Sequence, residues 1–138
     1  MSRLVPTVTD PDSRGFFEAA AKGDLVVRFC SRCDQVIHLP RAYCHACGSW
    51  DTEFRPVAGF GRLYSWTTVR HPAHPAFEVP YTVVLVELED VPAVRFVGRL
   101  PGVPDLEPGM RMRVTFDRFG EAGETMPNWI PESPASCP

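Results

Sequence analysis

The chain has 138 residues, a formal net charge of −3 and a hydrophobic fraction of 44%, which suits one compact domain or two very small ones. Its apolar runs span only a few residues, so we expect no membrane-spanning helix, and the acidic balance disfavours a general nucleic-acid binder. The first six residues lack the apolar core of a signal peptide, and we therefore expect a cytoplasmic protein.

The N-terminal part predicts a loose arm followed by one short helix. Asp10 reads as an N-cap, and the proline after it suits a first helical position, so we expect a helix over residues 11–22 that Gly23 ends. Phe16 and Phe17 fall on one face of this helix together with two alanines. That face either packs on the chain itself or docks on a partner, and the sequence leaves both readings open.

Four of the five cysteines form two closely spaced pairs, Cys30-Ser-Arg-Cys33 and Cys44-His-Ala-Cys47. Each Cys-x-x-Cys turn can point two sulfurs at one place, and the ten residues between the pairs are enough for a short hairpin that brings the turns together. Four thiolates suit tetrahedral zinc and leave no open coordination position. The spacing therefore predicts a structural Zn²⁺ site.

Other interpretations of these cysteines remain open. The ligand set does not exclude iron in a rubredoxin-like site. Two disulfides would be unusual in a cytoplasmic chain, and two pairs this close indicate one metal site more than a thioredoxin-like redox pair. We take His38 and His45 as non-ligands because four cysteines already suffice, and we take Cys137 as a free thiol in a flexible tail.

Short strands separated by proline- and glycine-rich turns follow from the rest of the sequence. We expect segments 25–29 and 36–39 to be the two strands of a ribbon, one on each side of the first cysteine pair. After Trp50 we expect strands at 61–69, 81–88, 94–100 and 111–119, with a shorter element near 53–57. Four or five strands in about 70 residues predict a small closed barrel of the OB type, and Gly98 marks a bend that closure needs.

The predicted fold is mainly β: an N-terminal helix, a rubredoxin-like zinc ribbon and an OB-fold barrel. We expect four segments: an arm and helix over 1–24, the zinc ribbon over 25–52, the barrel over 53–131 and a flexible tail over 132–138.

An ordered set of motifs resembles one known family. It comprises Phe16-Phe17-x-Ala-x-x-x-Gly23-x-Leu25, the two cysteine pairs with Pro40-Arg41 between them, Tyr64-Ser65-Trp66-Thr67, Pro80-Tyr81-x-Val83, and Pro108-Gly109-Met110. The chain is similar over residues 16–131 to zinc-ribbon OB-fold proteins, formerly domain of unknown function 35. It departs at Asp34, where glycine is common in the family, and at His45, where proline is common.

The resemblance implies a non-catalytic companion subunit. Such proteins assemble with thiolase-fold partners, including steroid side-chain aldolases, with hydratases of the same pathways, and in archaeal thiolase–synthase complexes. It implies that the helix and the ribbon are docking elements and that the barrel face helps to bind the acyl-CoA thioester. Two alternatives stay open: a single-stranded nucleic-acid-binding module and an iron-containing electron carrier.

The loop 71–80 is the most chemically equipped stretch outside the ribbon. Two histidines and a glutamate could form a base or a metal site, but the sequence places no partner nearby to complete one. We assign no catalytic residue and expect a loop that contacts substrate or partner. The candidate contact residues here are His71, His74, Phe77 and, at the start of the next strand, Tyr81.

Two strand faces complete the set of candidates. Phe60, Tyr64 and Trp66 share one face by period-two alternation, which predicts that they lie partly in the barrel core, with an aromatic platform for a flat ligand as the alternative. Arg95 and Arg99 share a face of another strand. They could bind CoA phosphates through charge-assisted hydrogen bonds, or they could be ordinary surface arginines.

Overall fold

The computed structural model describes residues 4–132, which form two compact units. The first unit contains residues 5–58 together with 116–126, and the second contains residue 4, 59–115 and 127–132. Cys137 and most of the predicted tail lie outside the described residues. In the described part, no helix is both long and apolar enough to cross a membrane.

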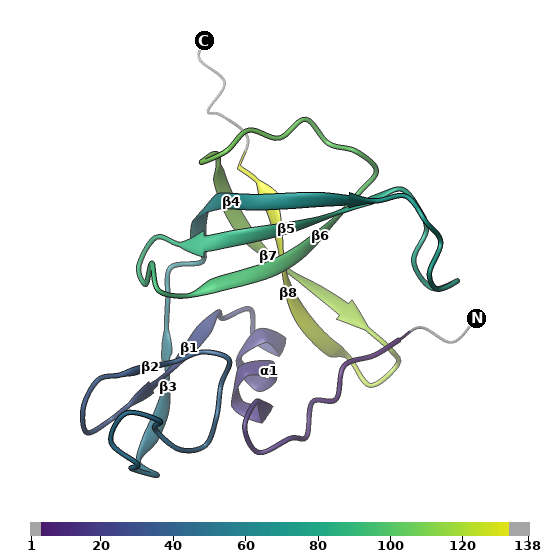
Figure 1. Cartoon of the computed structure of the whole chain (residues 1–138). Coiled ribbons are helices and arrows are strands. Elements are labelled where there is room, and N and C mark those ends of the chain that lie inside the picture. Colours follow the sequence, from purple (N-terminus) through teal and green to yellow (C-terminus); the bar gives the residue numbers. More distant parts are fainter. Residues whose placement is uncertain (1–3, 133–138) are drawn as a thin grey trace. The chain divides into compact units, whose positions relative to one another are not determined.

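The first unit combines helix α1 (Arg14–Ala21) with a three-stranded antiparallel sheet (Figure 1). Its strands are β1 (Val26–Cys30), β2 (Val36–Ile37) and β3 (Thr52–Pro56), in the order β2-β1-β3. The segment near residues 53–57, which the sequence led us to group with the barrel, therefore pairs with β1 instead. Proline follows Asp10 as expected, but it opens a separate turn, so the helix begins at Arg14.

The second unit is built on a five-stranded antiparallel sheet in the order β6-β5-β4-β7-β8. Its strands are β4 (Phe60–Val69), β5 (Tyr81–Leu88), β6 (Arg95–Pro101), β7 (Arg111–Phe119) and β8 (Glu124–Pro131). The outer ends of β7 and β8, within residues 116–126, belong to the first unit. The mainly β fold, with one short helix, a ribbon and an OB-fold sheet, confirms the predicted fold class.

A side chain links the two outermost strands of this sheet. The Asn128 amide on β8 accepts the Arg99 N–H through Oδ1 at 2.8 Å and donates to the Arg99 carbonyl through Nδ2 at 2.9 Å. Gly98 makes this approach possible, because a Cβ there would lie 2.8 Å from Asn128 Oδ1. The glycine thus permits the close approach of β8, whereas the register against β5 runs through Gly98 without a bulge.

The expected aromatic core face of β4 is wrong, because Gly61 and Leu63, which lie opposite the buried Leu88 and Val86, face the interior instead. The register against β5 shifts between Leu63 and Ser65, so the side chains on either side of Tyr64 do not keep one alternation. Leu63 is buried, whereas Tyr64 is 54% exposed and Trp66 is also exposed. Phe60 is half-buried under the Arg111 guanidinium, 4.1 Å from the ring centroid. The buried interior instead contains Val84, Val86, Met112 and Trp129.

Candidate metal centre and contact surfaces

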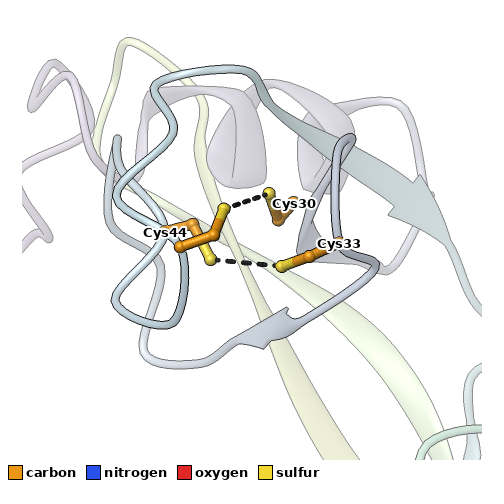
Figure 2. Close-up of side chains that lie close together, drawn as sticks. Cys30, Cys33 and Cys44 are labelled. Carbon is orange, nitrogen blue, oxygen red and sulfur yellow. Dashed lines mark hydrogen bonds between the residues drawn. The ribbon is translucent and has the colours of Figure 1, made fainter.

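The four cysteine sulfurs converge at one point. The Sγ atoms of Cys30 and Cys47 lie 3.6 Å apart, as do those of Cys33 and Cys44, and all four lie within 4.8 Å of one another. A tetrahedral zinc with bonds of about 2.3 Å requires sulfur–sulfur distances of about 3.8 Å. Figure 2 shows the sulfurs turned toward a common space between two loops. The donor set and its geometry thus suit structural zinc.

Tight turns after each cysteine pair aim the sulfurs. The Asp34 N–H donates to the Cys30 carbonyl at 2.9 Å, and the Gly48 N–H donates to the Cys44 carbonyl at 2.8 Å. Both turn residues have positive φ, 58° at Asp34 and 74° at Gly48. Glycine adopts this conformation without steric cost, and aspartate tolerates it better than most residues. Asp34, the departure noted in the sequence, therefore occupies the position that favours glycine.

In the absence of a metal, the thiols have unequal proton affinities. Burial raises the pKa of Cys44, but the N–H groups of Cys47 and Ala46 and the neighbouring thiols outweigh it, so the pKa lies at about 7. For Cys33 the Gln35 N–H lowers the pKa, whereas desolvation and the three other sulfurs raise it, giving about 12. Cys44 therefore gives up its proton more readily than Cys33, and a metal must displace the protons that remain.

An exposed apolar patch on the ribbon is a candidate surface that the sequence reading missed. Leu39 and Trp50 are each 75% exposed, and the Tyr43 and Trp50 rings lie 5.5 Å apart. A groove of about 400 Å³ adjoins them; its lining residues are Ile37, His38, Leu39, Arg41, Tyr43 and His45. We name Leu39, Tyr43 and Trp50 the ribbon patch. The sequence held one signal for this patch: a segment this short, folded around a metal, cannot bury so many large side chains.

The loop between β4 and β5 brings together four of the predicted contact residues. The Arg99 guanidinium lies 4.8 Å from the Phe77 ring centroid and 5.7 Å from that of Tyr81. The His74 ring lies 6.1 Å from Phe77, and its Nδ1 accepts the Ala76 N–H at 3.0 Å. Among the described residues, no carboxylate oxygen lies within 4.0 Å of Arg99. We name His74, Phe77, Tyr81 and Arg99 the loop cluster.

The other predicted contact residues lie elsewhere. Arg95 stacks on Tyr64 at 3.8 Å and pairs with Glu87 at 3.2 Å, so its charge is already partly compensated. His71 is exposed in the same loop as the cluster. Phe16 and Phe17 are half-buried in α1, with their rings in an edge-to-face arrangement 5.4 Å apart. The pair thus packs in part on its own unit, and its contact with a partner stays a prediction.

Comparison with known proteins assigns the family. The rubredoxin-like zinc ribbon domain of ChsH2 matches residues 17–53, and the C-terminal OB-fold domain of ChsH2 matches residues 54–117. A solved structure described as the Ltp2-ChsH2(DUF35) aldolase is 35% identical, covers 91% of this chain and 98% of that one, and has a TM-score of 0.80. The chain belongs to the ChsH2 (DUF35) zinc-ribbon and OB-fold family. The expected resemblance is thereby confirmed.

Three further proteins are similar to this chain over part of its length. A probable enoyl-CoA hydratase alpha subunit of Thermomonospora curvata is 44% identical over 101 residues, which is 72% of this chain and 31% of that protein. A DUF35 domain-containing scaffold protein of Pyrococcus furiosus is 39% identical over 91 residues, 61% of this chain and 62% of the scaffold. A DUF35 protein of Sulfolobus solfataricus, 15% identical with a TM-score of 0.57 and covering 77% of this chain and 78% of that one, shares the fold.

Proposed function

We propose that this chain is a non-catalytic accessory subunit that docks on a thiolase-like acyl-CoA enzyme and helps it to bind acyl-CoA. The proposal rests on the similarity of this chain to a chain of the Ltp2-ChsH2(DUF35) aldolase structure. The match covers 98% of that chain. The enoyl-CoA hydratase subunit points to the same substrate class, and the Pyrococcus scaffold protein to a supporting role. A steroid side-chain aldolase is the partner class implied by the resemblance, and the proposal places the assembly in the cytoplasm.

The ribbon patch supports docking. An exposed tryptophan, tyrosine and leucine next to one another are the residue types and arrangement of an interface centre, because each releases much apolar area from water on contact. The adjoining groove carries Arg41 and two histidines and no acidic residue among its lining residues. We therefore assign to the partner an apolar surface bordered by carboxylates.

The loop cluster supports contact with acyl-CoA. Arg99 is held over two aromatic rings without a carboxylate within 4.0 Å among the described residues, so its donors are available to a phosphate group. Phe77 and Tyr81 add flat apolar surface beside this charge. Since Arg95 is paired with Glu87, Arg99 is the stronger of the two predicted phosphate contacts.

Co-expression with a thiolase-like subunit tests docking. We expect the two chains to co-purify, and we expect Trp50→Ala and Arg41→Glu to weaken the complex by about tenfold or more. Matched controls are Tyr64→Ala and Arg113→Glu, which alter an exposed aromatic residue and an exposed arginine of the barrel unit. The docking proposal fails if no acyl-CoA enzyme binds the wild-type chain under native conditions.

Steady-state kinetics of the assembled complex tests substrate contact. A charge-assisted hydrogen bond is worth about 1.5–3 kcal/mol, so we expect Arg99→Ala to raise the KM for acyl-CoA by about 10- to 100-fold with little change in kcat. Arg113→Ala is the matched control. Unchanged KM in Arg99→Ala would remove the loop cluster from the substrate site while leaving docking intact. Tight binding of mixed oligonucleotides by the isolated chain would favour the nucleic-acid alternative instead.

A further inference from the structure

Four hydrogen bonds close a ring of residues beside the second cysteine pair. The Asp12 carboxylate accepts the Ala42 N–H at 2.7 Å, and the Asp12 carbonyl accepts from Arg28 Nη1 at 2.9 Å. Arg28 Nε donates to Thr52 Oγ1 at 3.0 Å, and the Thr52 hydroxyl donates to the Ala42 carbonyl at 2.9 Å. We name Asp12, Arg28, Ala42 and Thr52 the Ala42 ring. Two side chains thus hold both backbone polar groups of Ala42.

The position of Ala42 gives the ring its significance for the metal centre. Ala42 lies two residues before Cys44, on the loop that leads from β2 into the second cysteine pair. Within residues 39–43 of the described chain, Ala42 is the residue whose backbone forms hydrogen bonds. This stretch has no strand partner of its own. The Ala42 ring therefore fixes the backbone two residues before the second pair, in addition to the turn that follows Cys44.

The ring draws its members from separate elements of the first unit. Asp12 lies in the turn before α1, Arg28 in β1 and Thr52 in β3. The Arg28 guanidinium lies 4.8 Å from the Phe54 ring centroid. That ring in turn fills the space beside Gly15, where a Cβ would lie 2.7 Å from it. The start of α1, the sheet and the approach to the second cysteine pair are thus joined by direct contacts.

We propose that Asp12, Arg28 and Thr52 are positioning residues for the metal, and that through them metal occupancy is coupled to the first turn of α1. With Ala42 fixed, Cys44 is presented near its coordinating position and loses less freedom when the metal binds. When the metal leaves, the second cysteine pair is released, Ala42 loses its fixed position and Asp12 loses its partner. By linkage, an ordered turn at Asp12 in return favours the metal-bound state.

Zinc release to excess chelator, measured on the full-length protein, tests the positioning role. Thr52→Val keeps the side-chain shape and removes the hydroxyl, whereas Thr52→Ser keeps the hydroxyl. We expect Thr52→Val and Asp12→Ala to release zinc about tenfold faster, and Thr52→Ser to release it at the wild-type rate. Thr67→Val, at an exposed threonine of the barrel unit, is the matched control.

Each outcome decides the proposal. Variants that bind one zinc per chain and keep the wild-type circular dichroism spectrum are folded, so a faster release then reports positioning. Release rates within about twofold of wild type in both variants would overturn the proposal, as would Thr52→Ser behaving like Thr52→Val. If Asp12→Ala fails to fold, Arg28→Lys replaces it, because lysine keeps the charge but cannot bridge Asp12 and Thr52 in the same way.

Hydrogen exchange tests the coupling to the helix. In the wild-type protein we expect zinc removal to lower amide protection in the first turn of α1, residues 14–17. In zinc-loaded Asp12→Ala this protection is expected to be lost already, while protection of β4 to β6 stays unchanged. Equal protection of residues 14–17 with and without zinc would overturn the coupling. None of these measurements depends on a partner enzyme or on acyl-CoA.

Discussion

Replacing Gly98 with alanine should break the link between β6 and β8. The new methyl group would lie 2.8 Å from Asn128 Oδ1 and 3.1 Å from both the Trp129 backbone N and Val84 Cγ2. Two of these three neighbours are fixed, because Val84 is fully buried and the Trp129 N belongs to the backbone. We therefore expect the Asn128 amide to move away and give up its two hydrogen bonds to Arg99.

The size of the effect follows from these contacts. Losing two hydrogen bonds costs about 2 kcal/mol, and crowding in a packed interior adds about 1–3 kcal/mol. The reduced freedom of alanine in the unfolded chain offsets about 0.5–1 kcal/mol. We expect Gly98→Ala to lower the free energy of unfolding by about 2–4 kcal/mol. Asn128→Ala should lower it by about 2 kcal/mol, because it removes the hydrogen bonds without the clash.

Urea unfolding followed by tryptophan fluorescence measures this difference. The chain has three tryptophans, so the measurement uses a Trp50→Phe/Trp66→Phe background in which the buried Trp129 is the probe. Val97→Ala, at the exposed neighbour of Gly98, is the control and should change stability by less than about 0.5 kcal/mol. A Gly98→Ala protein within about 0.5 kcal/mol of wild type would refute the closure argument.

Three further predictions concern the metal, an ion pair and a strained turn. Removing the metal from reduced protein with a chelator should remove amide protection from the ribbon but not from β4 to β6, because such sites contribute on the order of 10 kcal/mol to folding. Ribbon amides that remain protected from hydrogen exchange after chelation would contradict this. The hydrogen bond from Arg111 lowers the pKa of Glu89, so its contribution to stability is complete above the unfolded pKa of about 4.3 and is lost as pH falls through the lower folded value. Glu89→Gln should therefore flatten the acid limb of a pH–stability curve, and an identical curve would count against the pair. Asp34→Gly relieves a φ of 58° but gives up an exposed ion pair with Arg55, so thermal unfolding should show a change within about 1 kcal/mol, whereas Asp34→Val should destabilise by more than that.

The elements with the clearest local signals could be predicted from the sequence. The strands over 81–88 and 111–119 have the bounds that alternation and flanking turns indicate. The four cysteines converge as their spacing predicts, because two short turns and a hairpin allow little else. In these cases the information lies within a few residues along the chain, so tertiary contacts do not alter the outcome.

The sequence-based predictions failed for features that depend on contacts between residues far apart in the chain. Strand β8 was not predicted, because Pro127 interrupts its pattern and glycines precede it; a proline is tolerated there because β8 ends the sheet order. The buried face of β4 depends on its partner strand, because Gly61 and Leu63 lie opposite the buried Leu88 and Val86 of β5. The Ala42 ring joins residues 12, 28, 42 and 52, which the fold brings together and no local pattern predicts. The small size of the ribbon indicates that some large side chains stay exposed, but it does not show that these are the residues of the ribbon patch.

The hairpin formed by β7 and β8 has a consequence for dividing the protein. Residues 116–126 belong to the same compact unit as the ribbon, and residues 122–125 line a hollow of about 330 Å³ with Phe17 and Ala21 of α1. A fragment ending at residue 58 would therefore present that side of the helix to water. Expression of the ribbon alone should yield a metal-binding but poorly soluble peptide, and one cut in the chain cannot separate the two units cleanly.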